Sequence, residues 1–452
     1  MAGHIPTSTP HTPSTPSTPS TTTGSDSEYK FAFMVMTVLF FIWGFITALN
    51  DILIPHLKAA FALNYTEAML VQFCFFGAYF IVSPFAGKLI EKIGYKNGVI
   101  TGLSTIAVGC LLFYPAAEVA IYGVFLLGLF VLASGITILQ VAANPYVASL
   151  GADRTAASRL NLAQAINSLG HTLGPLFGAA LIFGAVHQAV EPTAVQLPYL
   201  ILAGTVLLIA VGFKFLHLPA IHTNNKVTLT NKEVTLTKIK ANKSECDLIA
   251  HKGLVLGAIG IFLYVGAEVS IGSFLVNYFA QDDIAGLNEH QASQMVSYYW
   301  GAAMVGRFVG ALLTRYVPPS LVLVGNASIA MVLLLTTMLS SGDVAMWSII
   351  AVGFFNSIMF PTIFALAIRG LGPLTSRGSG LLCQAIVGGA LLPVIQGFVA
   401  DATSVQTSFI VPVLSYIYIC GYGIYRTLID QQESYLSNNT TTTNTKSMEP
   451  GL

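Results

Sequence analysis

The chain has 452 residues, of which 54% are hydrophobic and only 9% are charged, whereas about 25% of residues are charged in soluble globular domains. This composition excludes an ordinary water-soluble protein and indicates a membrane protein. The 20 Lys and Arg residues balance the 20 Asp and Glu residues, so no net charge attracts nucleic acid or an acidic partner. The spacing of the 5 cysteines, most of them in apolar runs, provides no disulfide framework and no cluster of metal ligands.

Both ends of the chain are polar. Residues 1–30 are mostly Ser, Thr and Pro, and residues 428–452 are rich in Asn and Thr. Segments of this composition cannot bury enough apolar surface to fold. We therefore expect a disordered tail at each end.

Between the tails, apolar residues form twelve blocks of about 20 residues or more, the length with which an α-helix crosses a bilayer. The blocks span residues 31–55, 68–90, 97–115, 119–148, 159–186, 197–217, 252–280, 290–314, 319–340, 344–369, 376–400 and 407–427. They lack the alternating pattern of membrane β-strands, and backbone amides in lipid need partners within their own segment. The sequence therefore predicts an all-α membrane protein with twelve transmembrane helices.

Most of the 20 Lys and Arg residues lie in alternate connections between the blocks. Because basic loops remain in the cytoplasm, both termini are expected there. The Lys-rich stretch 218–251 is then a cytoplasmic linker. It separates an N-terminal six-helix bundle, residues 31–217, from a C-terminal six-helix bundle, residues 252–427.

The two bundles are similar in sequence. Leu-Ala-Gln-Ala-Ile at residues 162–166 returns as Leu-Cys-Gln-Ala-Ile at residues 382–386, and Asn-Pro at 144–145 corresponds to Phe-Pro at 360–361. Two similar six-helix bundles joined by a cytoplasmic linker predict the major facilitator fold. In this fold the substrate binds between the bundles, near the bilayer midplane.

The connection after the second block reads Gly-Lys-Leu-Ile-Glu-Lys-Ile-Gly-Tyr-Lys, residues 87–96. It resembles the signature that major facilitator transporters carry at this place, with Glu instead of the usual Asp. A weaker counterpart, residues 306–315, follows the eighth block. We expect a charge latch that favours one access state, and its candidate residues are Lys88, Glu91, Lys92, Arg307 and Arg315. The alternative is a solvated turn that only supplies positive charge to a cytoplasmic loop.

Among the ionisable residues inside the apolar blocks, the candidates for function are Asp51, His171, Glu268 and Arg307. A charge at the centre of a membrane helix costs about 2.5–3.5 kcal/mol on insertion scales, so such a residue usually has a partner or lines a wet cavity. Asp51 and Glu268 lie on the first and seventh helices, which are equivalent in the two bundles, and both can face a shared cavity. Alternatively, Asp51 is an interfacial acid, Glu268 forms a structural ion pair with Arg307, and His171 is a buried histidine with satisfied hydrogen bonds. We expect Arg307 to belong to the latch.

The fifth block carries a polar stripe, in which Asn161, Gln164, Asn167 with Ser168, and His171 share one helical face. Neutral amides both donate and accept hydrogen bonds, which suits sugar hydroxyl groups. An anionic substrate would require Arg or Lys at mid-membrane, and we expect none there. The alternative is that the amides only join neighbouring helices. Further candidates are the amides Gln140, Asn144, Asn277, Asn356 and Gln384 and, for stacking on a sugar ring, the aromatic residues Trp43, Tyr79, Tyr146, Tyr298 and Trp300.

Several stretches resemble one branch of the major facilitator family, the fucose/galactose/glucose:cation symporters. They are Phe-Ile-Trp-Gly-Phe at 41–45 with Asn-Asp at 50–51, Ala-Ala-Asn-Pro-Tyr at 142–146, Arg-Leu-Asn-Leu-Ala-Gln at 159–164, Gly-Ala-Glu-Val-Ser-Ile-Gly at 266–272, and Asn-Ser-Ile-Met-Phe-Pro-Thr at 356–362. The resemblance covers nearly the whole membrane portion. It implies a transporter that moves a sugar together with a cation.

The resemblance also implies roles for individual residues. Fucose-transporting members use an aspartate of helix 1 to recognise the substrate, a glutamate of helix 4 to couple protons, and an asparagine of helix 5 in the cavity. The motifs place these roles on Asp51, Gln140 and Asn167. Because glutamine cannot take up or release a proton, coupling through Gln140 is in doubt. Glu268 is our candidate for the coupling acid, with Asp51 second, and either H⁺ or Na⁺ can serve as the cation.

The sequence thus predicts a bacterial inner-membrane transporter, monomeric and without cofactor or metal, that imports a glucose- or galactose-like hexose with a cation by alternating access. The candidate substrate-binding residues are Asp51, Gln140, Asn144, Gln164, Asn167 and Gln384, and the candidates for cation coupling are Glu268 and Asp51. Alternatives are a facilitator that exports small amphipathic compounds and a membrane sugar sensor that does not transport. An enzyme is not expected, because the spans contain no nucleophile–base pair and no metal motif.

Overall fold

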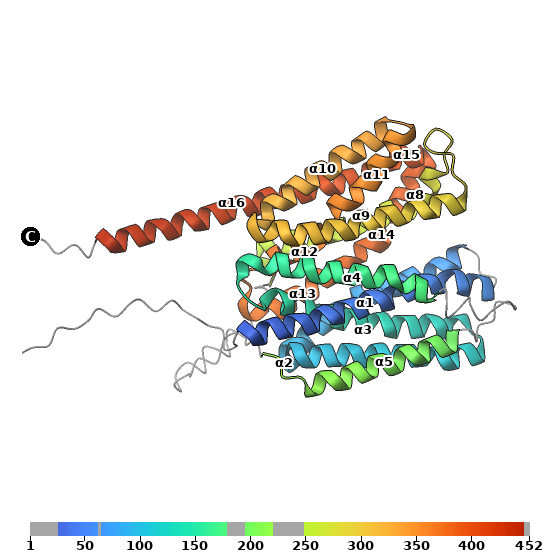
Figure 1. Cartoon of the computed structure of the whole chain (residues 1–452), viewed down its shortest axis with the longest axis horizontal. Helices are drawn as coiled ribbons and strands as arrows, with labels where there is room; N and C mark the ends of the chain where they lie inside the picture. Colours follow the sequence, from blue (N-terminus) through green and yellow to red (C-terminus); the bar gives the residue numbers. More distant parts are fainter. Residues whose placement is uncertain (1–25, 62–64, 179–194, 220–247, 447–452) are drawn as a thin grey trace, which may run out of the picture.

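The computed structural model describes residues 26–61, 65–178, 195–219 and 248–446. The expected N-terminal tail up to residue 25, residues 220–247 of the linker and residues 179–186 of the fifth predicted helix lie outside the described residues. All regular structure within these ranges is helical. The helices form two groups that lie side by side (Figure 1). We call residues 26–219 the N-half and residues 248–446 the C-half.

The N-half contains six of the twelve predicted spans. Its helices are α1 (Asp26–Ala60), α2 (Tyr65–Val119), α3 (Tyr122–Ser149), α4 (Ala156–Gly178) and α5 (Gln196–Phe215). The long helix α2 holds two spans, because Gly94 has a φ of 81° and non-helical geometry. A Cβ atom on Gly98 would lie 2.8 Å from Cγ1 of Ile90, whereas eight residues of continuous helix span about 12 Å. The chain therefore folds back at Gly94, a conformation that glycine adopts without strain.

The C-half contains the other six spans. Its helices are α8 (Lys252–Phe279), α9 (Glu289–Tyr316), α10 (Pro319–Leu339), α11 (Gly342–Asn356), α12 (Met359–Ile368), α13 (Thr375–Gln384), α14 (Gly388–Ala402), α15 (Val405–Ser408) and α16 (Ile410–Lys446). The tenth span is divided into α11 and α12, and the eleventh into α13 and α14 by a 3₁₀ turn at Ala385–Val387. The prediction of twelve membrane helices is confirmed within the described ranges, with interruptions that the apolar pattern does not indicate.

Length and hydropathy alone identify fewer spans. Nine segments of the described residues are long and apolar enough to cross a membrane, and one of them, Leu70–Val119, contains both spans of α2. Helices α4 and α9 are not among these segments, because polar residues interrupt their apolar sequence. Large apolar side chains such as Leu208, Leu339 and Phe398 are exposed on the outside, as lipid contact requires. The polar side chains of α4 and α9 therefore need partners or a wet cavity inside the bundle.

Within each half, one pair of helices packs with the two backbones almost in contact, and the two pairs are equivalent. A Cβ atom on Gly170 of α4 would lie 2.1 Å from the carbonyl oxygen of Phe41 in α1. Likewise, a Cβ atom on Gly388 of α14 would lie 2.0 Å from the carbonyl oxygen of Phe262 in α8. Small residues permit this close approach, which is a main source of helix association in membranes. The pairs α1–α4 and α8–α14 thus hold their side chains in fixed positions.

The structure differs from the sequence prediction at the tails. Helix α1 begins at Asp26, and α16 continues through the expected C-terminal tail to Lys446, so that it extends beyond the bundle (Figure 1). No Gly or Pro occurs between Ile424 and Lys446 to end the helix. An ion pair of 2.9 Å between Arg369 and Asp430 also holds the first turns beyond residue 427 against the bundle.

Candidate functional site

A cavity of about 150 Å³ lies between the two halves. From the N-half it is lined by Trp43, Gln140, Gln164 and Asn167, and from the C-half by Tyr264, Val265, Glu268, Arg307, Phe360, Pro361 and Ile386. Gln140 lies nine residues before the end of α3, which corresponds to about 14 Å along a helix, or roughly half of a hydrocarbon core of about 30 Å. The cavity is therefore close to the middle of the membrane.

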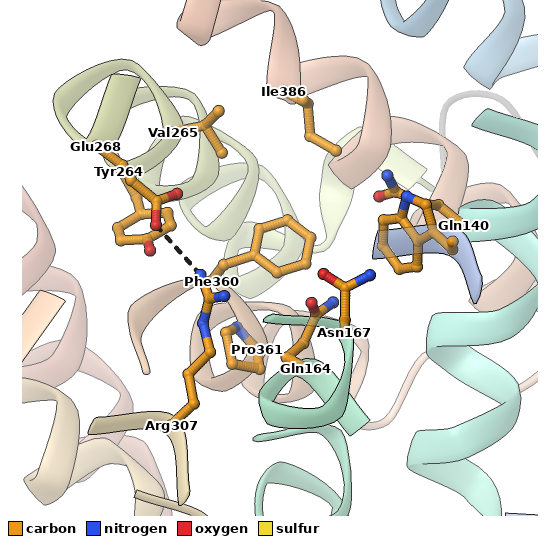
Figure 2. A pocket seen from close by; sticks show the side chains of 11 residues that line it. Gln140, Gln164, Asn167, Tyr264, Val265, Glu268, Arg307, Phe360, Pro361 and Ile386 are labelled. Atoms are coloured by element: carbon orange, nitrogen blue, oxygen red, sulfur yellow. Dashed lines mark hydrogen bonds and ion pairs between the residues drawn. The ribbon is translucent and has the colours of Figure 1, made fainter. Parts of the chain in front are cut away.

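Three amides form the N-half wall of this cavity. Gln164 and Asn167 lie one turn apart on α4, and Gln140 faces them from α3 (Figure 2). The Nδ2 of Asn167 donates a hydrogen bond of 2.8 Å to the carbonyl oxygen of Phe40, and the Nε2 of Gln140 donates to the hydroxyl of Tyr79. These bonds fix the two carboxamide groups in orientation. Each amide has further donor and acceptor capacity that a ligand hydroxyl can use.

The C-half wall carries an ion pair. Nη2 of Arg307 lies 3.2 Å from Oε1 of Glu268, and both side chains are only 15% exposed. Figure 2 shows the guanidinium directed at the carboxylate, with the ring of Phe360 between this pair and the amides. The pair brings no net charge into the cavity. A carboxylate and a guanidinium therefore lie in the same chamber as the amides.

Arg307 is held by two further acceptors. Its Nε donates at 3.2 Å to the carbonyl oxygen of Ser357, and its Nη1 donates to the hydroxyl of Ser168 on α4. The Ser357 carbonyl is available because Pro361, four residues later, has no backbone N–H to pair with it. One side chain thus contacts α8, the α11–α12 break and the opposite half.

The position of Arg307 corrects one expectation. The sequence predicts no basic residue at mid-membrane, which is wrong, because Arg307 lines the cavity. Its expected role in the latch stays a prediction. Arg307 lies nine residues before the end of α9 at Tyr316, about 14 Å along the helix, where it lines the cavity. The ion pair of Glu268 with Arg307 that the alternative interpretation expects is present. A partly buried carboxylate and a proline-freed carbonyl together make this place favourable for a guanidinium.

Two other amides of the predicted site do not line the cavity. Asn144 is completely buried within α3. Gln384, at the end of α13, donates a hydrogen bond of 3.2 Å to the carbonyl oxygen of Phe80. This carbonyl also lacks a helical partner, because Pro84 follows it by four residues. Gln384 therefore joins the two halves beside the cavity instead of facing into it.

Asp51 lies within α1, but its side chain is outside the part of the structure that is described. Among the aromatic candidates, Trp43 lines the cavity, and Tyr79 contributes through Gln140. Tyr298 and Trp300 are exposed on α9. The hydroxyl of Tyr146 donates to the carbonyl of Pro219, away from the cavity.

Residues outside the predicted site complete the C-half wall, and the candidate amide Asn356 lies in the layer behind it. Tyr264, Phe360 and Ile386 line the cavity, and they lie in or next to the stretches 266–272, 356–362 and 382–386 that the sequence comparison already singled out. Asn356 donates hydrogen bonds of 2.7 and 3.2 Å to the buried hydroxyls of Tyr299 and Tyr416. No pattern within a single helix indicates these contacts, because they join three helices.

One end of the bundle carries the basic connections around residues 88–96, 154–159, 315 and 369–377, and we call it the basic end. Several hydrogen bonds join the halves there. Ser158 donates to the carbonyl of Ala311 at 2.5 Å, and Asn161 donates to the hydroxyl of Thr362 at 3.3 Å. Ser379 donates at 2.9 Å to the carbonyl of Val141, which Pro145 leaves without a helical partner. The halves are thus closely joined at the basic end.

The predicted latch residues have different environments. Glu91 forms an ion pair of 2.7 Å with Arg377 of α13, across the two halves. Lys88 and Lys92 are exposed. Arg315 is exposed and lies 6.0 Å from the centre of the Tyr316 ring. Arg377 is not among the predicted latch residues, although it precedes the repeated stretch 382–386 in the way that Arg159 precedes the stretch 162–166.

Twelve membrane helices in two similar halves, with a polar chamber between them, define a transporter of the alternating-access type. Residues 32–386 match the family model of the Major Facilitator Superfamily. The chain belongs to this superfamily, which confirms the predicted fold and indicates a transporter and not an enzyme.

Relatives within the superfamily resemble the chain over nearly its whole length. It is 52% identical over 427 residues to a protein of Brucella abortus named glucose/galactose transporter, covering 94% of this chain and 99% of the relative. It is 35% identical over 423 residues to the L-fucose-proton symporter of Escherichia coli, covering 89% and 94%. A crystal structure of the superfamily transporter FucP in the outward conformation matches with a TM-score of 0.79 and 34% identity, over 88% of this chain and 99% of that one. The predicted resemblance to sugar symporters is confirmed.

Proposed function

We propose that this protein imports a neutral hexose, glucose or galactose, together with a cation by alternating access. The observation that carries the proposal is a single cavity with three amides on one wall and an acid paired with Arg307 on the other. The names of the two relatives support both parts, since one is a glucose/galactose transporter and the other is a proton symporter of L-fucose.

The lining favours a neutral polyol. Gln140, Gln164 and Asn167 present donors and acceptors that match hydroxyl groups, and Trp43 and Phe360 present apolar surfaces for the ring. An anionic substrate would have to displace Glu268 from Arg307 and would then meet the repulsion of the free carboxylate. The polar lining also argues against an exporter of amphipathic compounds, which would require a more apolar chamber. The same contacts would bind sugar in a sensor that does not transport, and an uptake assay distinguishes such a sensor from a transporter.

Glu268 is the proposed coupling residue. It is the only acid among the described residues that line the cavity, and a carboxylate there can hold H⁺ or coordinate Na⁺. Gln140 can bind the sugar but cannot carry a proton. Asp51 remains the second candidate for cation coupling and for substrate binding. Gln384 is proposed to act indirectly, through its hydrogen bond between the two halves, and Asn144 stays a candidate for substrate binding.

The positive-inside rule places the basic end in the cytoplasm, together with both termini and the linker 218–251. The contacts between the halves at this end then close the cytoplasmic side, and the similarity to an outward conformation supports that assignment. We propose that the pair Glu91–Arg377 is the latch, with Lys88, Lys92 and Arg315 as surrounding positive charge. The protein is then a monomeric transporter of a bacterial inner membrane, with six-helix bundles at residues 31–217 and 252–427.

Uptake by the purified protein in vesicles tests the proposal. Labelled glucose, galactose and fucose are offered under separately imposed proton and sodium gradients. We expect one gradient to drive accumulation of glucose or galactose. If no hexose enters faster with a gradient than without one, the symport function is wrong.

The variant Glu268→Gln tests the coupling residue. It keeps the size of the side chain and removes its charge, so gradient-driven accumulation is expected to disappear while sugar counterflow continues. Asp401→Asn, which changes an exposed acid at the end of α14, is the matched control and should accumulate sugar normally. Loss of counterflow in Glu268→Gln would show a binding or structural role instead of coupling.

A further inference from the structure

We propose that the guanidinium of Arg307 competes with the transported cation for the carboxylate of Glu268. Release of Arg307 from Glu268 then makes sugar binding and cation binding favour each other. The inference rests on the proposed function, because it explains how the two substrates of a symporter depend on each other. It assigns the arginine a role in coupling that is separate from the latch at the basic end.

The geometry gives the guanidinium three anchors. Nη2 lies 3.2 Å from the Glu268 carboxylate, Nε lies 3.2 Å from the Ser357 carbonyl, and Nη1 contacts the Ser168 hydroxyl. Only the first anchor carries a charge. The Ser357 contact can persist when Glu268 is occupied, because it depends on the backbone break before Pro361 and not on the acid.

The carboxylate of Glu268 is therefore already paired with a positive charge of the protein, the guanidinium of Arg307. A proton or sodium ion that binds this carboxylate must displace the guanidinium, because two positive charges on one partly buried acid repel each other strongly. With both side chains 15% exposed, water can screen this repulsion only in part. In the absence of sugar, Arg307 thus weakens cation binding.

The displaced guanidinium then needs another acceptor. An arginine has only donors, and a buried donor without a partner costs free energy. The hydroxyl oxygens of a sugar in the cavity can accept from Arg307, since Arg307 lines the same cavity as Gln164, one of the amides on the opposite wall. Sugar thereby favours the released arginine, and the released arginine favours cation binding.

The surroundings of Glu268 leave Arg307 as its main charged neighbour among the described residues. The other titratable groups that interact electrostatically with Glu268 are the phenols of Tyr264, Tyr299 and Tyr416, which are neutral near pH 7. His171 lies on α4, one turn beyond Ser168. Because Arg307 is the main charged neighbour of Glu268, we expect it to compete with a proton and with a sodium ion alike.

The test is a linkage measurement on the full protein in detergent or vesicles. The dissociation constant of galactose is measured with and without the cation, in one arm by adding sodium at constant pH and in the other by lowering the pH without sodium. Wild type is expected to bind galactose at least about 5-fold more tightly with the coupling cation, the lower range of coupling between linked sites. In Arg307→Gln this ratio should fall to about 1, since neither ligand then needs the release of the arginine.

The control is Arg369→Gln, which removes an arginine whose ion pair with Asp430 is 44% and 24% exposed and lies at the basic end. It should keep the wild-type ratio. Should Arg307→Gln fail to fold, Arg307→Lys provides a second test, because it keeps a positive charge beside Glu268. A ratio well above 1 in Arg307→Lys supports the inference, and a ratio of about 1 overturns it.

The results separate this inference from the proposed function. If wild type shows no gradient-driven hexose uptake, the proposed function fails. If wild type is a symporter and a folded Arg307→Gln keeps the full ratio, only the competitor role of Arg307 is wrong.

Discussion

The contact between α1 and α4 yields a quantitative prediction for Gly44→Ala. A Cβ atom at position 44 would lie 2.0 Å from the backbone oxygen of Asn167 and 3.0 Å from its Nδ2. Carbon atoms in such contacts essentially never lie closer than 3.0 Å, so the two helices must separate by about 1 Å at this level. The substitution therefore acts on the backbone and on a residue of the cavity at the same time.

The expected effect has two parts. Overpacking of a tight interface costs about 1–3 kcal/mol. A shift of about 1 Å also breaks the hydrogen bond of 2.8 Å between Asn167 and the Phe40 carbonyl, which contributes about 1 kcal/mol. We expect the protein to lose about 2–4 kcal/mol of stability. We also expect weaker hexose binding, because the amide of Asn167 loses its fixed orientation.

Thermal unfolding in detergent and hexose counterflow in vesicles measure these two effects. The matched control is Gly77→Ala on α2, where no atom lies within 4 Å of the added carbon. Gly77→Ala should unfold and transport like wild type. Equal unfolding temperature and equal affinity in the two alanine variants would refute the reasoning about the close α1–α4 contact.

Two further predictions concern the polar layer of the C-half and the basic end. Asn356→Leu should destabilise the protein by about 1–3 kcal/mol, seen as a lower unfolding temperature, because the buried hydroxyls of Tyr299 and Tyr416 lose their hydrogen-bond partner. Arg377→Gln removes an ion pair with Glu91 whose side chains are 23% and 34% exposed, so stability should change by less than about 1 kcal/mol. The same variant should open the basic end more often, since a contact between the halves is lost.

Opening is measured as alkylation of a thiol introduced by Ser379→Cys, at a position buried between the halves, above the background of the 5 native cysteines. Arg369→Gln is the control, because it breaks an ion pair within one half. Alkylation that is no faster in Arg377→Gln than in this control contradicts the latch.

For the polar layer, the control is Asn326→Leu, which loses only a bond to its own helix and should be nearly neutral. A similar loss of stability in Asn326→Leu and Asn356→Leu would contradict the role of Asn356.

The sequence predicted the number and approximate bounds of the membrane helices, because apolar blocks of the necessary length are a local property. Helix α8, Lys252–Phe279, differs by one residue from the predicted block 252–280. The interruptions after Asn356 and Gln384 were missed, since a continuous apolar run does not show where the backbone leaves helical geometry. Pro361 was visible in the sequence, but the residue that uses its freed acceptor was not.

The amides of the cavity were partly predictable. The polar stripe of α4 correctly indicated Gln164 and Asn167, because helical periodicity determines which residues share a face. Gln384 has the same place in the repeat as Gln164, yet it binds the carbonyl that Pro84 releases on α2. Symmetry of sequence therefore does not ensure symmetry of contacts.

The place of Arg307 in the cavity was not predicted from the sequence. Three acceptors from three different segments hold its guanidinium, and they lie 39, 50 and 139 residues away in the sequence. Only tertiary packing brings these groups together. The pairing of Glu91 with Arg377 was missed for the same reason.

Sugar-dependent cation movement is the most direct test of the account. Vesicles containing the protein are prepared without any ion gradient, galactose or glucose is added outside, and internal pH and sodium are followed with indicators. We predict that the added hexose draws H⁺ or Na⁺ into the vesicles, and that Glu268→Gln abolishes this movement while sugar exchange continues. Hexose entry with no accompanying cation in wild type would contradict the account.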